Sequence, residues 1–589
     1  MRSLAFNFIT LHYAWVVFMG LLSLPILLPY GNLAAIDAYF FGASASTMSG
    51  LNTHDCKDLA LYQQLYIYFV PLLTNLGFVN IMVVVVRLYW FNKRIDKLGH
   101  ALIRARRRLA PDASPALDAL GLAPESGATR SASASTHQDN ESPLQRSPLQ
   151  RSEPSVSQDW VHEEKTTLAR LSGRRKTTTL GRDADVDTLT SKDRDEIGGV
   201  EYRSLKLLLK VVTVYFFGIH LLGGFGLLGW IQYADAKYTN NLREIGQDQK
   251  WWAFYTAQSM MDNLGFSLTP DSMAPFRDAV WPLLLMSFLG LAGETLYPVF
   301  LRFILWTLSR LAPRGSPMRE SCRFLLKHPR RCYTLLFPSG TTWALLSIIS
   351  ALNAFDTLLI VVLDRHNPQV AGLDVGKRIA AALFQAVASR HAGMTPYTLA
   401  DVHPAVQVSL LVMMYISAYP VALSVWTSNA YEERPVGLYA AEARYDENKG
   451  LSYLVRHMQQ QLSFDLWYIF IGIFLLAVSE SSKIQDSNEP ASPQTCQLSL
   501  SFEIFPIFFE VVSAYANVGI SLGHASTTAS LSARFSVVGK LVICAMMIRG
   551  RHRALPSKLD RAVMLPDEHL LEGPEEEASR PMMDRTSWP

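Results

Sequence analysis

Four short stretches of this sequence share a glycine in a setting that could turn backbone carbonyl oxygens toward a cation. The glycines are Gly50, Gly265, Gly393 and Gly519. A serine stands six residues before each of them, except that the third stretch has Val387, and a small polar residue stands two residues after each: Asn52, Ser267, Thr395 and Ser521. Glycine frees the backbone to leave helical dihedral angles, so neighbouring carbonyls can point at a ligand instead of at their own helix.

The spacing of the four glycines indicates an internal repeat. Successive glycines are 215, 128 and 126 residues apart, and the first separation falls to 125 when the polar segment 111–200 is left out. Four units of one length, the first carrying an insertion, are typical of a repeat architecture.

Apolar stretches flank each glycine in pairs. Crossing a bilayer takes about 20 apolar residues. We predict eight spans, of which the last two are short: Leu4–Tyr30, Leu65–Phe91, Leu205–Ile231, Val280–Leu308, Thr341–Val362, Val406–Trp426, Phe464–Val478 and Phe535–Ile548. Non-helical backbone at membrane depth survives only where it is buried in protein or lines a watery cavity. The sequence therefore predicts an all-α polytopic membrane protein, with four helix–pore loop–helix repeats around a pseudo-fourfold central pore.

The predicted organisation has four repeats and two polar segments. Residues 1–110 form repeat 1 with a basic cytosolic end, 201–335 repeat 2, 336–450 repeat 3 and 451–561 repeat 4, while 111–200 is a linker and 562–589 a tail. The linker is rich in Ser, Thr, Asp, Arg and Pro, too polar to offset its ordering entropy, so we predict disorder there and in the tail. Arg174–Thr178 in the linker fits a kinase site, and a plain solvated linker is the alternative.

The distribution of basic residues predicts the orientation. They crowd 87–108, 310–331 and 549–561, after the second, fourth and eighth spans, and the first two clusters contain only Asp96 and Glu320 as acids. By the positive-inside rule these segments and both termini are cytosolic, and the pore loops enter from outside.

Composition excludes several other classes. The five cysteines, Cys56, Cys322, Cys332, Cys496 and Cys544, show neither metal-binding spacing nor a disulfide framework. No nucleophile–base set, phosphate-binding loop or HExxH motif is present, which argues against an enzyme and against a cofactor. The net charge of +3 is small and gives no indication of a nucleic-acid partner. Leu4–Tyr30 is too long for a signal peptide, so we expect it to remain as the first span.

Polar side chains inside the apolar runs predict hydrogen bonds between helices more than ion sites. A charged group at the centre of a span costs about 2.5–3.5 kcal/mol on insertion scales, so each needs a partner. These residues are Asn75, Asn80, His220, Glu294, Asn353 and Asp356.

Four glycine loops meeting on one axis could form a selectivity filter of backbone carbonyls, as in K⁺ channels. No ring of acids is present, since only Asp262 closely precedes a glycine. Glycines that merely pack helices are the alternative. The predicted filter residues are Thr47, Met48, Ser49, Gly50 and Leu51 in repeat 1, Asn263, Leu264, Gly265 and Phe266 in repeat 2, His391, Ala392, Gly393 and Met394 in repeat 3, and Asn517, Val518, Gly519 and Ile520 in repeat 4.

Outside the linker and tail, the chain resembles the Trk/Ktr/HKT superfamily of K⁺ transporters, and its fungal Trk branch in particular. The specific stretches are FGASASTMSGLNTHD (41–55), NLGFSLTPDSM (263–273), VHPAVQVS (402–409), MMYISAYPVALS (413–424), VSAYANVGISLG (512–523) and KLVICAMMIRGR (540–551). The resemblance implies K⁺ uptake across the plasma membrane, driven by the membrane potential. It matches the family's filter glycines to the four above. Serine at the first of these positions goes with Na⁺ preference in the family, and Gly50 here favours K⁺.

The resemblance also implies a basic gate in the last helix. The family's arginine after a glycine matches Gly550–Arg551, and Lys540 matches a basic residue higher in that helix. Arg549 and Arg551 could instead be ordinary cytosolic charges. Two residues depart from the expected pattern: a bulky His391 after Arg390, and Asp262 just before a filter. Either could alter selectivity or pH response.

Two other functions stay open at this point. One is a Na⁺-preferring carrier, or a carrier that couples K⁺ to Na⁺ or H⁺. The other is a membrane sensor or scaffold whose working part is 111–200. Membrane lipid and further copies of the chain are the remaining candidate partners.

Overall fold

The computed structural model describes residues 8–109, 194–195, 198–365, 367–417, 419–431, 450–486, 502–524 and 527–553. Nearly all of the predicted linker, the whole predicted tail and Cys496 lie outside these residues. Contacts group the chain into two units, Phe91–Gly198 with Pro435–Ala440, and the remainder, which carries the four glycines. In the described part the regular elements are helices, with one isolated bridge between His524 and Thr527, so the predicted all-α fold class is confirmed.

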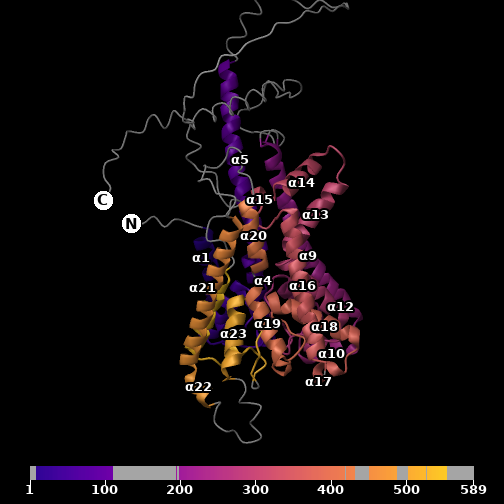
Figure 1. Cartoon of the computed structure of the whole chain (residues 1–589), viewed down its shortest axis with the longest axis vertical. Coiled ribbons are helices and arrows are strands. Elements are labelled where there is room, and N and C mark those ends of the chain that lie inside the picture. The colour runs from indigo at the N-terminus through magenta and orange to yellow at the C-terminus, as the bar shows by residue number, and fades with distance from the viewer. Residues whose placement is uncertain are drawn as a thin grey trace, which may run out of the picture. The chain divides into compact units, whose positions relative to one another are not determined.

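Each predicted repeat contains a leading helix, a short pore helix and a following helix or helix pair (Figure 1). Repeat 1 has α1 (Phe8–Leu21) with α2 (Ser23–Leu27), pore helix α3 (Ala35–Thr47), and α4 (Leu61–Thr74) with α5 (Leu76–Leu109). Repeat 2 has α9 (Gly199–Tyr233), α10 (Ala236–Glu244), pore helix α11 (Gln249–Met261), and α12 (Val280–Gly293) with α13 (Tyr297–Leu311). Repeat 3 has α16 (Ser339–Leu363), pore helix α18 (Val375–His391), and α19 (Pro404–Ile416) with α20 (Tyr419–Tyr431). Repeat 4 has α21 (Gly450–Ser479), pore helix α23 (Ile504–Ala516) and α24 (Val537–Gly550). The short α14 (Pro317–Lys327), α15 (Pro329–Cys332), α17 (Pro368–Ala371) and α22 (Ser481–Asp486) connect these elements.

Length and hydropathy agree with a membrane protein. Among the described residues, five helical segments are long and apolar enough to cross a membrane: Thr10–Tyr30, Leu76–Asp96, Gly199–Tyr233, Ser339–Leu363 and Pro404–Val425. Each overlaps one predicted span. The predicted Phe464–Val478 is the end of the longer α21. The 14-residue α24 is about 21 Å long at 1.5 Å per residue, less than the hydrocarbon core.

The predicted continuous span Val280–Leu308 is instead two helices, α12 and α13, that meet at 87°. Glu294 leaves the helical region at the break, with φ −137° and ψ −69°. Gly293 lies so close to the carbonyl of Met261 that a Cβ there would overlap it. Pro298 lies in the first turn of α13, a position where proline starts a helix instead of kinking one.

The following helix is interrupted in repeats 1, 2 and 3, and it is short in repeat 4. The break lies at Asn75 between α4 and α5, at Glu294 after α12, and at Ser417 after α19, while α24 ends at Gly550 and is followed by Arg551. In three repeats these residues contact the ends of pore helices: Asn75 donates to Asp262, Glu294 accepts from Asn263, and Arg551 donates to Met48. Polar groups at the breaks of repeats 1 and 2 and at the end of α24 therefore lie beside glycine loops.

Candidate functional site: a ring of four glycine loops

The four glycines form a closed ring in the order of the repeats. A Cβ added to Gly50 would lie less than 3.0 Å from the carbonyl oxygen of Leu264. The same overlap occurs between Gly265 and the carbonyl of Ala392, between Gly393 and that of Val518, and between Gly519 and that of Ser49. Every glycine thus lies against the residue that precedes the next glycine, and the fourth returns to the first.

The backbone of the ring requires glycine for a second reason. All four have positive φ, from 62° at Gly393 to 88° at Gly519. Side chains rarely tolerate this left-handed region, and here a side chain would also strike backbone, which cannot rotate aside. The structure therefore brings together the four glycines on which the sequence prediction depends.

Three of the four pore helices end in the same cap. Met48, Asn263 and Asn517, each two residues before its glycine, adopt the left-handed conformation with φ of 54–57°. The next amide then donates to the carbonyl five residues back: Ser49 to Ser44, Leu264 to Ser259 and Val518 to Ser513, at 2.8–3.1 Å. This is the Schellman pattern, in which a left-handed residue stops the helix and satisfies its last carbonyls.

The third pore helix ends differently. Helix α18 continues through His391, and the amides of Ala392 and Gly393 both donate to the carbonyl of Ala388, at 3.0 and 3.3 Å. The side chain of His391 lies outside the described residues. The third loop is therefore held without the cap that the other three share.

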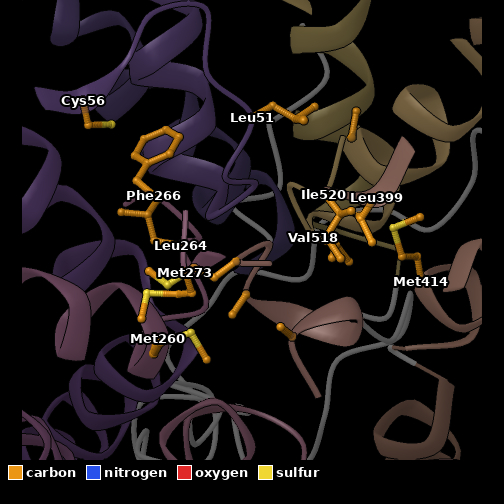
Figure 2. Packing of buried hydrophobic residues seen from close by; sticks show 14 of the residues in the cluster. Leu51, Cys56, Met260, Leu264, Phe266, Met273, Leu399, Met414, Val518 and Ile520 are labelled. Atoms are coloured by element: carbon orange, nitrogen blue, oxygen red, sulfur yellow. The ribbon is translucent and has the colours of Figure 1, made fainter. Parts of the chain in front are cut away.

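Apolar side chains beside the glycines anchor the loops from behind (Figure 2). Leu51, Phe266, Met394 and Ile520, directly after the glycines, are at most 2% exposed and belong to the main hydrophobic cluster. Leu264 and Val518, directly before two of the glycines, are also fully buried in it. Because these side chains pack into the protein, the peptide groups between them are what each loop presents to its neighbours.

A cavity of about 130 Å³ lies next to the residues that come after the glycines in the sequence, and we call it the vestibule. Its lining includes all four glycines and the four polar residues predicted two positions later, Asn52, Ser267, Thr395 and Ser521. Hydrogen bonds tie its wall together across repeats. Ser530 Oγ donates to the carbonyl of Asn52 at 2.6 Å, and the amide of Met273 donates to the carbonyl of Thr395 at 3.0 Å.

Asp55 supplies a carboxylate to the vestibule wall and accepts a hydrogen bond from Thr528 of repeat 4. Partial burial raises the pKa of Asp55 above the usual value, and the bond from Thr528 opposes that shift in part. The nearby acids Asp58 and Asp271 raise it further. Asp55 therefore protonates at a less acidic pH than an exposed aspartate would.

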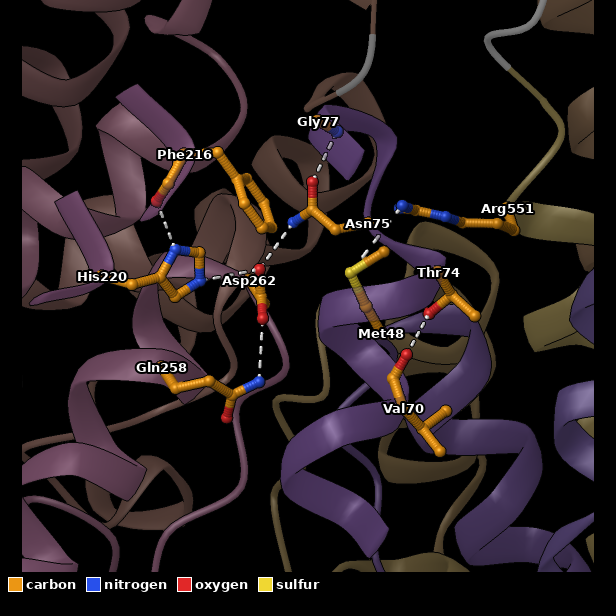
Figure 3. Close-up of polar contacts among 10 residues, drawn as sticks. All are labelled: Met48, Val70, Thr74, Asn75, Gly77, Phe216, His220, Gln258, Asp262 and Arg551. Atoms are coloured by element: carbon orange, nitrogen blue, oxygen red, sulfur yellow. Dashed lines mark hydrogen bonds and ion pairs between the residues drawn. The ribbon is translucent and has the colours of Figure 1, made fainter. Parts of the chain in front are cut away.

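Asp262 forms the centre of a buried network at the end of pore helix α11 (Figure 3). Asn75 Nδ2 donates to Asp262 Oδ1 at 2.9 Å, and Gln258 Nε2 donates to Oδ2 at 2.8 Å. His220 Nε2 lies 3.1 Å from Oδ1, while its Nδ1 donates to the carbonyl of Phe216 at 2.7 Å. The helix-to-helix bonds predicted for Asn75 and His220 are present, and their shared partner is Asp262.

Arg551 reaches from the end of α24 toward the first two repeats (Figure 3). Its Nη2 donates to Met48 Sδ at 3.8 Å, and the nearby carboxylates of Glu294 and Asp262 interact with its charge. The guanidinium of repeat 4 therefore lies beside groups of repeats 1 and 2, next to the residues that precede the filter glycines.

The other two predicted gate residues lie elsewhere. Lys540 Nζ is 2.7 Å from Asp37 Oδ1, in the first turn of pore helix α3. Arg549 Nη1 donates to the hydroxyl of Tyr13 at 3.2 Å, and its guanidinium stacks over the ring of Tyr468. The structure thus brings Arg551, but neither of these two, to the ends of the filter loops.

Sequence reasoning missed two acids of this region. Asp37 is the one acid in the apolar run of pore helix α3, and that isolation was a readable signal for a buried partner such as Lys540. Asp55 gave no such signal, because its partner Thr528 is 473 residues away in the sequence. In the described part of the chain, no group of three or more His, Cys, Asp or Glu side chains could hold a metal ion.

Helical repeats that close a backbone ring under a polar cavity define a pore-loop membrane protein. The sequence matches the TrkH family, described as a cation transport protein, over residues 177–572, which is more than half of the chain. The chain belongs to this family.

Curated relatives come from several fungi. The chain is 43% identical over 393 residues to "Potassium transporter TRK1" of Candida albicans, which covers 66% of this chain and 36% of that protein. It is 41% identical over 422 residues to the "Low-affinity potassium transport protein" of Saccharomyces cerevisiae, covering 67% and 46%. With "Potassium transport protein 1" of Schizosaccharomyces pombe it shares 42% over 395 residues, covering 66% and 45%. The matched region thus spans between a third and a half of these relatives.

Among solved structures, the potassium transporter TrkH from Vibrio parahaemolyticus aligns with 94% of this chain and 85% of its own, at 13% identity and a TM-score of 0.45.

The four loops approach one another so closely that adding one methyl group to a ring glycine should destabilise the protein. Gly393→Ala places a Cβ against the carbonyl of Val518 and forces alanine to positive φ. Strain of this kind costs about 1–3 kcal/mol, so the purified variant should melt at a lower temperature in detergent. Gly372→Ala in the same repeat is the control, since nothing lies within 4 Å of its Cβ. Equal melting temperatures for the two variants would contradict the closed ring.

Proposed function

We propose that this chain takes up K⁺ across the plasma membrane, with the carbonyls of the four glycine loops replacing water around the ion. The observation that carries the proposal is the closed ring, in which the carbonyl oxygens of Ser49, Leu264, Ala392 and Val518 each lie against the glycine of the adjacent repeat. Three fungal relatives that are named as a potassium transporter or as potassium transport proteins support it.

The chemistry of the loops favours a monovalent cation of low hydration energy. Backbone carbonyls carry partial charge only, so they compensate a weakly hydrated K⁺ better than a strongly hydrated divalent ion. The negative ends of the pore-helix dipoles, from α3, α11, α18 and α23, add to this field because each helix ends at its loop. The proposal assigns the filter to the residues predicted from the sequence.

The charge pattern supports one orientation for this transport. The basic residues of α13 and α14 and of the end of α24 belong on the cytosolic side by the positive-inside rule, which puts the vestibule outside and both termini inside. Potassium would then enter through the vestibule, pass the ring and meet Arg551 on its way to the cytosol.

Rubidium uptake tests this function directly. In cells without their own K⁺ uptake systems, the chain should support saturable Rb⁺ uptake that K⁺ inhibits more strongly than Na⁺ does, because the carbonyl ring fits weakly hydrated ions. Gly265→Ala should abolish uptake with the protein still at the surface, while Gly372→Ala should keep it. A wild-type chain at the surface without Rb⁺ uptake would contradict the proposal. Equal inhibition by Na⁺ would favour the Na⁺-coupled carrier.

We assign the gate to Arg551. A fixed cation beside the path repels a permeating K⁺, most strongly where the surroundings exclude water. Its contact with Met48 and its interaction with Glu294 and Asp262 hold the guanidinium next to the filter ends. Arg549 is engaged with Tyr13 and Tyr468, so it serves as a matched control in the same turn of the helix.

Removing the charge of Arg551 should raise the rate of transport. Arg551→Ala is expected to increase Rb⁺ flux per surface molecule several-fold, whereas Arg549→Ala should change the amount of protein more than the flux per molecule. Flux per molecule is measured as initial uptake divided by surface labelling. An unchanged flux in Arg551→Ala would remove this residue from the gate.

Asp55 should make uptake sensitive to external pH. Its carboxylate attracts cations to the vestibule when ionised, and its pKa is raised by burial. As external pH falls toward that raised pKa, Asp55 protonates and the attraction weakens.

Asp55→Asn should therefore lower the apparent affinity for Rb⁺ a few-fold at neutral pH and flatten its dependence on acid pH. Glu244→Gln is the control, since the exposed Glu244 neither lines the vestibule nor shifts the pKa of Asp55. The measurement is the initial rate of Rb⁺ uptake at several external pH values. Identical pH profiles for wild type and Asp55→Asn would contradict this role.

A further inference from the structure

The four pore helices differ at the position three residues before the filter glycine. That position holds Thr47 in repeat 1, Asp262 in repeat 2, Arg390 in repeat 3 and Ala516 in repeat 4. Two adjacent repeats therefore carry opposite charges at the same place in the pore. Arg390 is the unusual one, because a cation this close to a cation pathway opposes the ion that the loops should attract.

Arg390 is 1% exposed, and its guanidinium contacts two other helices of its own repeat, α16 and α19. Nε donates to Asn353 Oδ1 of α16 at 3.0 Å, and Nη2 donates to Met413 Sδ of α19 at 3.0 Å. Nη2 also lies 3.6 Å from Asp356 Oδ2 of α16. The side chain thus joins the end of pore helix α18 to both of its neighbours.

Asp356 is the group that compensates this charge. It is 1% exposed, and its Oδ1 accepts a hydrogen bond from Ser409 Oγ at 2.9 Å. Its Oδ2 forms an ion pair with the equally buried guanidinium of Arg390. A buried charge is tolerated when it is paired, and losing one partner leaves the other uncompensated.

The pair occurs in the one repeat whose pore helix lacks the common cap. Helices α3, α11 and α23 end in a left-handed residue two positions before the glycine, whereas α18 runs on to His391 without one. In the third repeat Gly393 itself makes the bond to the carbonyl five residues back, that of Ala388. The anchoring of Arg390 to α16 and α19 takes the place of that cap. It holds the residue two positions before Ala392, whose carbonyl lies in the ring against Gly265.

We propose that Asp356 is a positioning residue of the third filter loop, which neutralises Arg390 and holds it away from the ion at the carbonyl ring. The inference rests on the proposed K⁺ transport and assigns the third repeat a specific part in it. Arg390 fixes the end of the pore helix and so positions the third loop. Asp356 compensates the positive charge of Arg390, which would otherwise repel a cation in the pathway.

A double-mutant cycle tests the pair. Wild type, Asp356→Asn, Arg390→Met and the double variant are compared for the concentration dependence of Rb⁺ uptake, for inhibition by Na⁺ and for protein at the surface. Asp356→Asn should lower the apparent affinity for Rb⁺ about tenfold, because the charge of Arg390 is no longer compensated. Replacing Arg390 by the uncharged Met in that background should recover most of this loss, while Asp356→Glu should keep the wild-type affinity.

Glu201→Gln is the matched control, since it breaks the ion pair with Arg87 at 3.3 Å, far along the chain from any filter loop. It should leave Rb⁺ affinity and Na⁺ inhibition unchanged. The inference is overturned if the double variant is no better than Asp356→Asn, or if all the variants change only the amount of surface protein. If the wild type transports Rb⁺ but the effects of the two substitutions are simply additive, only this inference is contradicted. If the wild type at the surface does not transport Rb⁺, the proposed function is contradicted as well.

Discussion

The arrangement depends on how closely four backbone segments approach one another. At each step around the ring, the space that a Cβ would need is filled by a carbonyl oxygen of the next repeat. Peptide dipoles packed this tightly repel one another unless something holds them, and the buried side chains on either side of the glycines do so from behind. Hydrophobic burial of Leu51, Phe266 and Ile520 thus fixes the positions of groups that are themselves polar.

The surrounding helices support the ring unequally. Repeats 1, 2 and 4 end their pore helices with a left-handed residue, and repeat 3 instead has a buried arginine, Arg390, that ties the end of its pore helix to α16 and α19. Repeat 2 pins the end of its pore helix through Asp262, whose partners Asn75 and His220 come from two repeats. Because the four repeats belong to one chain, the residues of each repeat can differ from those of the others, which is impossible in four identical subunits. This freedom allows one arginine, Arg551, to reach beneath the loops from a single direction.

Much of the fold could be predicted from the sequence, because the four repeats have matching spacings between their glycines. Matched glycines and apolar pairs indicated the helix–pore loop–helix order and the residues that meet in the ring. The break at Glu294 could not be predicted, because it depends on Gly293 meeting the carbonyl of Met261 in space. The pairing of Arg390 with Asp356 could not be predicted either, because hydropathy does not show which buried charges pair. Asp37 stands out as an isolated acid, but its partner Lys540 is 503 residues away in the sequence. The departures noted at Asp262 and at Arg390–His391 marked places where tertiary contacts override the repeat.

A structure of the purified protein in Tl⁺ or Rb⁺ tests the central claim most directly. The account predicts strong ion density on the axis between the carbonyls of Ser49, Leu264, Ala392 and Val518, and its loss when Gly265→Ala is examined under the same conditions. Density confined to side-chain carboxylates, with none at the carbonyl ring of the wild-type chain, would contradict it.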